Sequence, residues 1–231
     1  MNTQPPVSDY SRARAVSTTE PDRSLYKATF IWLAVAFLVA AFGTLVIGPL
    51  VPLSMMMPLS IVTIIVLLAS GFFRATLKAK TQRVLNVVLI LGIPLLLGIT
   101  LYPAIAYYTS VNPSILVYAF VGTVVLFGAM AAWGAFATRR IYGISGILFG
   151  LVIAMIVLGL LNAFVFHLSV LALIISVIVL IIFCIYSYMD VQAMQDRAYG
   201  EDATVYALAL FLDIINIFTS LLNILGFLNN D

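Results

Sequence analysis

Seven long apolar runs dominate the sequence and restrict the folds that are open to it. They lie at about residues 28–48, 57–73, 84–105, 114–137, 143–165, 168–189 and 203–228. A helix of roughly 20 residues crosses the hydrocarbon core of a bilayer, whereas a barrel strand needs only about ten alternating residues. With 64% hydrophobic and 9% charged residues, the chain has the composition of an integral membrane protein. We predict an all-α, polytopic bundle of seven transmembrane helices.

The segments between the runs are short, so residues 26–231 are predicted to form one transmembrane domain. Residues 1–25 are polar, contain prolines and show no apolar periodicity. They are predicted to form a disordered cytoplasmic tail. The first run has full membrane length and lacks a cleavage site, so we do not expect a signal peptide.

All eleven basic residues fall on one side of a seven-span arrangement. They are Arg12, Arg14, Arg23, Lys27, Arg74, Lys78, Lys80, Arg83, Arg139, Arg140 and Arg197. Because Lys and Arg in short loops are retained in the cytoplasm, we predict a cytoplasmic N-terminus and a C-terminus outside. The net charge of +2 is explained by this topology and by contact with the lipid bilayer, and it gives no reason to expect nucleic acid.

Two aspartates, Asp190 and Asp213, lie near the facing ends of the last two runs. An intramembrane carboxylate is costly unless it is protonated, paired or hydrated, which makes it a functional-site hypothesis. Gly200 is predicted to follow the end of the sixth helix, and Asp202 to cap the seventh. Asp190 lies ten residues before Gly200 and Asp213 eleven after Asp202, which places each about 15 Å from the turn. We therefore predict similar depths on adjacent antiparallel helices.

Polar residues form a stripe along the seventh predicted helix, at spacings of three and four: Asp213, Asn216, Ser220 and Asn223. Such spacing places them on one helix face, which we predict to point inward. Together with Ser187, one turn before Asp190, the residues Asn216, Ser220 and Asn223 are candidates for an ion pathway. Asp190 has an alternative interpretation, as a residue at the helix end that is solvated by the cytoplasm. Asp213 has apolar neighbours on its helix and therefore needs a partner within the membrane.

Arg74 ends the second run in the string SGFFRATLKAK. Two positions are open to its guanidinium group. It extends toward the cytoplasm, as basic side chains near helix ends commonly do, or it turns inward to pair with a carboxylate. The residue pattern by itself slightly favours the first.

The C-terminal string ALALFLDIINIFTSLLNILGF, with YSYMDVQ before it, resembles the Bax inhibitor-1 family, also called the transmembrane Bax inhibitor motif family, in a bacterial-type form. The likeness extends from about residue 28 to the end. It includes MPLS with an apolar run ending in FFR, then LGITLYPAIAYY, and LLNAFVF in the fifth run.

The resemblance implies a seven-helix fold and a pH-sensitive calcium leak channel or Ca²⁺/H⁺ exchanger, with Ca²⁺ and protons as transported ions and no tightly bound cofactor. Asp190 and Asp213 match a hydrogen-bonded, proton-sensing pair, and Arg74 matches the arginine that latches it. Met189 departs from the tyrosine that usually precedes the first aspartate, and Thr63 lies near a position where bacterial relatives can carry a glutamate.

Two carboxylates in contact cannot both ionise cheaply, so the pair is expected to share one proton. A shared proton draws the two helices together and closes the cytoplasmic end. We expect Asp190 and Asp213 also to act as transient ligands for Ca²⁺, a cation that prefers oxygen.

Two alternatives belong to other functional classes. The first is a non-conducting protein that binds and modulates membrane proteases or stress and death factors. In that case the basic tail would contact a membrane-protein partner. An intramembrane aspartyl protease also places one aspartate on each of two helices, but Leu210, Phe211 and Leu212 replace the glycine-containing motif expected before Asp213. We therefore predict a non-enzyme. The lack of an organelle signal indicates a multi-pass protein of a bacterial plasma membrane.

Overall fold

The computed structural model describes residues 23–76, 79–141, 144–200 and 202–229, and their side chains except within 71–80. Residues 1–22, most of the predicted tail, lie outside the described residues. The described chain forms seven helices long and apolar enough to cross a membrane. The prediction of an all-α protein with seven transmembrane helices is confirmed, and the orientation of the termini stays a prediction.

The helical elements follow one another with short connections. In chain order they are α2 (Arg23–Phe42), the π-helical turn η1 (Gly43–Ile47), the 3₁₀ turn η2 (Gly48–Leu50), α3 (Leu53–Thr76), α4 (Ala79–Val111), α5 (Pro113–Phe136), α6 (Ser145–Leu161), the π-helical turn η4 (Asn162–Phe166), α7 (Ser169–Gln195) and α8 (Ala203–Asn229). The ends of α4 and α7 extend past the predicted apolar runs because their polar terminal residues remain helical.

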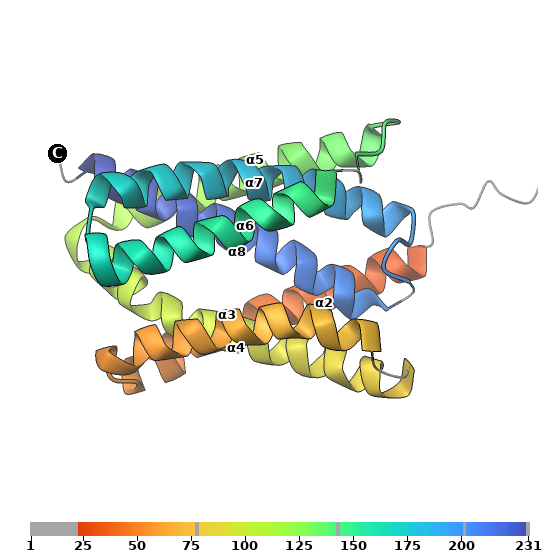
Figure 1. Ribbon diagram of the computed structural model, residues 1–231, viewed down its shortest axis with the longest axis horizontal. Helices are drawn as coiled ribbons and strands as arrows, with labels where there is room; N and C mark the ends of the chain where they lie inside the picture. The colour runs from red at the N-terminus through yellow and green to blue at the C-terminus, as the bar shows by residue number, and fades with distance from the viewer. Residues whose placement is uncertain (1–22, 77–78, 142–143, 201, 230–231) are drawn as a thin grey trace, which may run out of the picture.

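The last helix lies at the centre of the bundle. In Figure 1, α8 runs between a group formed by α2, α3 and α4 and a group formed by α5, α6 and α7. It packs against α7, α2, α5 and α4, whereas α3 packs mainly against α4 and α6 against α7. Leu210 and Phe211 of α8 belong to the largest buried cluster, together with Ile90 of α4 and Ala36 of α2. Asp213 therefore sits on the helix that both groups share.

The end of α2 and the turn η1 that follows it meet α4 with their backbones in contact. A Cβ on Gly98 would collide with the carbonyl oxygen of Ala40, and one on Gly43 would lie 2.6 Å from the carbonyl oxygen of Leu95. The hydroxyl of Thr44 lies 2.8 Å from the Gly98 carbonyl oxygen and donates across the interface. Small residues commonly allow such close packing between membrane helices.

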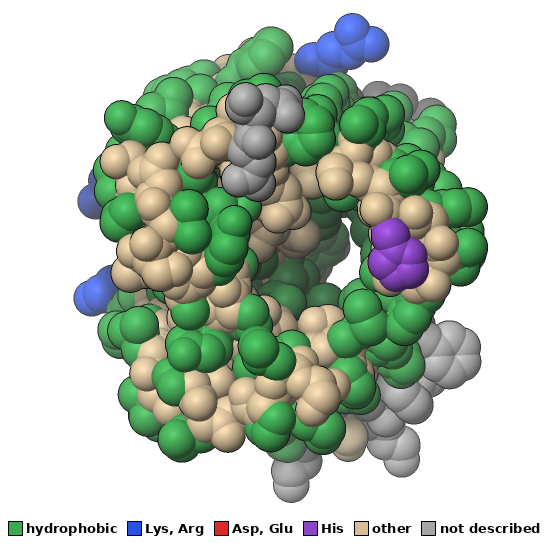
Figure 2. All heavy atoms as spheres, turned by 90° about the vertical axis from the view of Figure 1, so that its left-hand side faces the viewer, with side chains coloured by type: hydrophobic (Ala, Val, Ile, Leu, Met, Phe, Trp, Pro, Cys, Tyr) green, Lys and Arg blue, Asp and Glu red, His purple; other side chains and the backbone are tan. Residues whose placement is uncertain are grey.

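The described basic residues gather at one end of the bundle, which we call the basic end: Arg23, Lys27, Arg83, Arg139, Arg140 and Arg197. There α2, α4 and α8 begin and α3, α5 and α7 end. Figure 2 shows the opposite end, where hydrophobic side chains lie among backbone and uncharged polar side chains and no acidic side chain is visible among the coloured residues. A hollow opens between the helices on that face.

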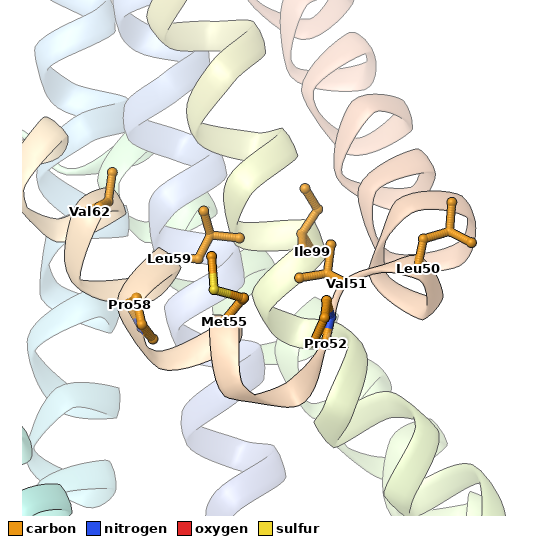
Figure 3. A pocket seen from close by; sticks show the side chains of 8 residues that line it. All are labelled: Leu50, Val51, Pro52, Met55, Pro58, Leu59, Val62 and Ile99. Atoms are coloured by element: carbon orange, nitrogen blue, oxygen red, sulfur yellow. The ribbon is translucent and has the colours of Figure 1, made fainter.

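An apolar pocket of about 460 Å³ lies where η2 leads into α3. Figure 3 shows the side chains that line it: Leu50, Val51, Pro52, Met55, Pro58, Leu59, Val62 and Ile99. None of them carries a carboxylate, hydroxyl or amide, so the pocket offers no side-chain ligand to a cation. It is not the candidate functional site.

Candidate functional site

Asp190 and Asp213 are brought together by the packing of α7 against α8. Asp190 is 6% exposed and Asp213 is 2% exposed. The negative charge of Asp190 acts on the Asp213 carboxylate, so the two groups lie within electrostatic range. The burial of Asp190 disfavours the alternative of a solvated residue at the helix end. Two buried carboxylates thus share one polar site in an apolar bundle.

Each carboxylate has a different neighbour. The phenol of Tyr199 donates to Oδ1 of Asp190 at 3.0 Å. The Ser187 hydroxyl contacts the Asp213 carboxylate, but it also donates to the Phe183 carbonyl at 2.8 Å. One hydroxyl proton serves one of these acceptors at a time. Oδ2 of Asp213 is buried and has no hydrogen-bond partner, a state that is costly for a carboxylate in an apolar interior.

The predicted polar stripe of α8 faces α7 at two levels. Asp213 meets Ser187, and the amide of Asn223 lies 3.4 Å from the hydroxyl of Ser176. Ser220 is buried, whereas Asn216 is half-buried and donates to the Leu212 carbonyl of its own helix at 2.7 Å. Asn223 is exposed. The stripe is therefore buried at Asp213 and Ser220 and open at its far end.

These contacts fix the antiparallel register of α7 and α8 and refine the predicted similar depth of the two carboxylates. Asp213 is opposite Ser187, so Asp190 lies three residues closer to the basic end, an axial offset of about 4.5 Å at helical rise. Helical side chains lean toward the N-terminus of their own helix. Because α7 and α8 run in opposite directions, Asp190 and Asp213 lean toward each other, which reduces the offset.

This remaining offset arises because α7 ends earlier than expected. The helix ends at Gln195, and the chain turns at Arg197, which has φ 51°. The amide of Ala198 donates to the Ala193 carbonyl at 2.9 Å, and that of Arg197 to the Met194 carbonyl at 3.4 Å. This is a Schellman motif with arginine at the position usually held by glycine. Gly200, with φ 82°, belongs to the following turn.

The prediction for Asp202 was correct. Its Oδ1 accepts the amide of Thr204 at 3.1 Å and the Thr204 hydroxyl at 2.6 Å. This is the hydrogen bonding of an N-cap.

Side chains of α7 hold the segment that follows α5 against the site. The phenol of Tyr188 and the amide of Gln192 both donate to the Arg139 carbonyl, at 3.0 and 2.9 Å. Arg140 forms a bidentate pair with Asp196, with both nitrogen–oxygen distances 2.9 Å. These contacts fix the last two turns of α7, on which Asp190 lies.

Gly134 allows α5 to approach the same turns of α7. A Cβ at this position would collide with the carbonyl oxygen of Tyr188. The rings of Trp133 and Tyr188 pack edge to face, with centroids 5.9 Å apart. Gly134 therefore sets the spacing between α5 and the turn that precedes Asp190.

A family model described as inhibitor of apoptosis-promoting Bax1 matches residues 22–230. This chain belongs to the Bax inhibitor-1 family. An uncharacterised protein of Campylobacter jejuni is 32% identical over 229 residues, which cover 96% of this chain and 97% of that protein. Bax inhibitor 1 of Rattus norvegicus is 31% identical over 130 residues, and a probable Bax inhibitor 1 of Paralichthys olivaceus is 31% identical over 125 residues. Each of these two matches covers 53% of this chain and 52% of the relative.

Two positions singled out by the resemblance lie on α3. The helix includes Arg74, but the side chain of Arg74 lies outside the described residues, so the predicted latch stays a prediction. Thr63 is fully buried and donates to the Leu59 carbonyl of its own helix at 2.8 Å. In this member of the Bax inhibitor-1 family, a neutral hydroxyl therefore occupies that level of α3.

Within the described part of the chain, no three His, Cys, Asp or Glu side chains gather in a group that could hold a metal ion. The site offers the carboxylates of Asp190 and Asp213 and the hydroxyl of Ser187. A hard cation bound there would need further ligands from amide or carbonyl oxygens or from water.

The hydrogen bond between Tyr199 and Asp190 was not predicted from the sequence. Tyr199 lies in the turn between α7 and α8, nine residues after its partner Asp190. No helical spacing relates the two, because the chain reverses at Arg197 before it reaches Tyr199. The only sequence signal is an aromatic residue in the polar string AYGED.

Proposed function

We propose that this member of the Bax inhibitor-1 family is a pH-sensitive calcium leak channel or Ca²⁺/H⁺ exchanger, gated by Asp190 and Asp213. The main support for the proposal is the unsatisfied carboxylate oxygen of Asp213. Its Oδ2 is buried without a hydrogen-bond partner, beside a second buried carboxylate on the adjacent helix. Such a group needs a proton or a cation, and these are the two species that the proposed activity exchanges.

The proton acts on the two aspartates as a pair. Since two neighbouring buried carboxylates cannot both be charged cheaply, one proton satisfies both, and the pair titrates as a unit. The inclination of Asp190 and Asp213 toward each other favours this sharing. The shared proton holds α7 against α8 and keeps the site closed. A change in protonation breaks the link between the two helices.

A passing Ca²⁺ replaces the proton in the open state. Carboxylate and hydroxyl oxygens from Asp190, Asp213 and Ser187 suit this cation. Because two of the ligands carry charge and the rest are neutral or water, binding is weak enough for release, as conduction requires. Ser220, Asn216 and Asn223 continue the polar face of α8 away from the basic end. The hollow in the opposite face (Figure 2) supports an exit there.

Arg74 is proposed as the latch of the closed state. A guanidinium that reaches the carboxylates makes charge-assisted hydrogen bonds and excludes a cation from the same oxygens. Release of Arg74 and loss of the shared proton are then two parts of one opening step.

The membrane of residence is proposed to be the plasma membrane of a bacterium. The match to the Campylobacter jejuni protein extends over nearly the full length of both chains, which supports a bacterial-type member. The seven spans establish a multi-pass arrangement by length and composition.

The test is calcium flux into liposomes that contain the purified protein and a calcium dye. We expect Asp213→Asn, and Asp190→Asn with Asp213→Asn, to abolish the dependence of flux on pH. Asp196→Asn is the matched control, because Asp196 lies on the end of α7 in a partly exposed pair with Arg140. Circular dichroism and size-exclusion chromatography establish that each variant is folded.

Unchanged flux and an unchanged pH profile in the double variant would overturn the proposal. Absence of flux from the wild-type protein in pure liposomes would also count against it. Recovery of a specific membrane partner by crosslinking would then favour the non-conducting alternative.

A further inference from the structure

The turn between α7 and α8 folds back over the end of α7. Two left-handed residues shape it, Arg197 with φ 51° and Gly200 with φ 82°. The amide of Gly200 donates to the Arg197 carbonyl at 2.9 Å, which closes the turn between them. Tyr199 is thereby directed back toward the helix that the chain has just left.

Tyr206, one turn into α8, anchors Tyr199. The backbone amide of Tyr199 donates to the phenol oxygen of Tyr206 at 3.0 Å, and that phenol donates to the Gly200 carbonyl at 2.8 Å. The rings of Tyr199 and Tyr206 stack with centroids 5.4 Å apart and an interplanar angle of 29°. Tyr206 itself is 1% exposed. Tyr206 therefore attaches the turn to the buried core.

From this anchored position, Tyr199 reaches the candidate site. Its phenol donates to Oδ1 of Asp190 at 3.0 Å. Tyr199 is 48% exposed, whereas Asp190 is 6% exposed. One half-exposed side chain thus connects the surface at the basic end to a buried carboxylate.

We propose that Tyr199 is a cover for Asp190 on the basic-end side, and that its phenol competes with a hard divalent cation for Oδ1. A hydrogen-bonded oxygen is a poorer cation ligand, so the phenol must leave before Ca²⁺ binds Asp190 from this side. Tyr206 holds the turn in place while the phenol of Tyr199 swings away. The competition with Ca²⁺ rests on the function proposed above, whereas the covering of Asp190 is independent of it.

Two substitutions separate the hydrogen bond of Tyr199 from the bulk of its ring. Tyr199→Phe keeps the ring and its stacking on Tyr206 but removes the hydrogen bond to Asp190. Tyr199→Ala removes both the hydrogen bond and the bulk. Tyr118→Ala is the control, because Tyr118 is exposed on α5 and its loss removes a tyrosine of similar accessibility. Since Tyr199 is half-exposed, neither substitution empties a core position.

The first measurement is the reaction of Asp190 with a water-soluble carbodiimide and an amine. The carboxyl adds to the carbodiimide, and the amine displaces the urea to leave an amide at Asp190. Peptide mass spectrometry at fixed pH quantifies this amide. For Tyr199→Phe we expect the rate to rise about tenfold, as for the loss of one hydrogen bond to a charged group, and for Tyr199→Ala to rise further. Tyr118→Ala should react like the wild type.

The second measurement is calcium flux in liposomes with the same variants. Faster labelling of Asp190 together with faster flux supports both the cover and its competition with the cation. Faster labelling without flux in any variant supports the cover and counts against the proposed channel. Labelling of Asp190 that is unchanged in both Tyr199 variants overturns the inference, whatever the flux.

Discussion

The side-chain amide of Asn86 on α4 donates to Oδ2 of Asp202 at 3.0 Å. The other oxygen of Asp202 accepts from the amide and the hydroxyl of Thr204. One carboxylate thus caps the central helix and attaches its first turn to α4. The depth of Asp213 relative to the α2–α3–α4 group depends on this attachment.

The cap should make stability depend on pH in the acid range. Partial burial acts to raise the pKa of Asp202, but hydrogen bonds from Thr204 and Asn86 and the charge of Arg83 outweigh it, so this pKa lies below its usual value. The stabilisation is therefore complete above the pKa of an unfolded aspartate, about 3.9. It is lost as the pH falls through the lower pKa of the folded state.

We expect the melting temperature of the wild type in detergent to fall between about pH 5 and pH 3, and that of Asp202→Asn to fall less over this range. At pH 7, Asp202→Ala should cost about 1 kcal/mol, the usual value of an N-cap. Thermal unfolding followed by tryptophan fluorescence measures both. An acid dependence identical in wild type and Asp202→Asn would contradict the assignment.

Replacement of Gly134 should weaken the packing around Asp190. A Cβ in Gly134→Ala collides with the Tyr188 backbone, so α5 and α7 must separate, at a cost of about 1–3 kcal/mol. Gly128→Ala is the control on the same helix, because no atom lies within 4 Å of the added Cβ. The melting temperature should fall for Gly134→Ala alone. Equal melting temperatures for the two variants would show that the close approach does not limit stability.

The ion pair of Arg140 and Asp196 should contribute little. Both side chains are 35% exposed, and exposed pairs typically stabilise by at most about 1 kcal/mol. We expect Arg140→Gln to lower the melting temperature slightly at low salt and to differ still less from the wild type at high salt. A large, salt-independent loss would show instead that Arg140 is needed to hold the segment between α5 and α6 on α7.

The latch can be tested through resting flux. If Arg74 holds the aspartate pair closed, Arg74→Gln should raise calcium flux at neutral pH about tenfold, as for the loss of a charge-assisted hydrogen bond. Arg23→Gln removes a positive charge at the same end of the bundle and is the control. Equal flux in the two variants would leave Arg74 with the alternative role of a basic side chain extended toward the cytoplasm.

The sequence predicted those features that depend on local chemistry. Span number followed from the length of each apolar run, because a bilayer demands that length whatever the packing. The cap at Asp202 followed from a side chain that bonds its own neighbours. The inward position of Asp213 followed from a carboxylate with only apolar residues beside it on its helix.

Features that depend on contacts between distant segments were not predicted. The end of α7 was placed near Gly200, whereas the Gln195 side chain donates to the Ala135 carbonyl at the end of α5 and the chain turns at Arg197. The partner of Asp190 was missed for the same reason, since only the shape of that turn brings Tyr199 back. The central position of α8 was not predicted either, because its polar stripe indicates one inward face but not that other helices surround it on several sides.

The central place of α8 has a consequence for how the chain is made. Synthesis proceeds from the N-terminus, so the helix that joins the two groups is the last of the described spans to leave the ribosome. Until residue 203 and those after it enter the bilayer, α2 and α5 have lipid where their common neighbour will lie, and the polar side of α7 has no counterpart. Insertion of the earlier spans therefore precedes assembly of the complete bundle, which must wait for α8 because both groups pack on it.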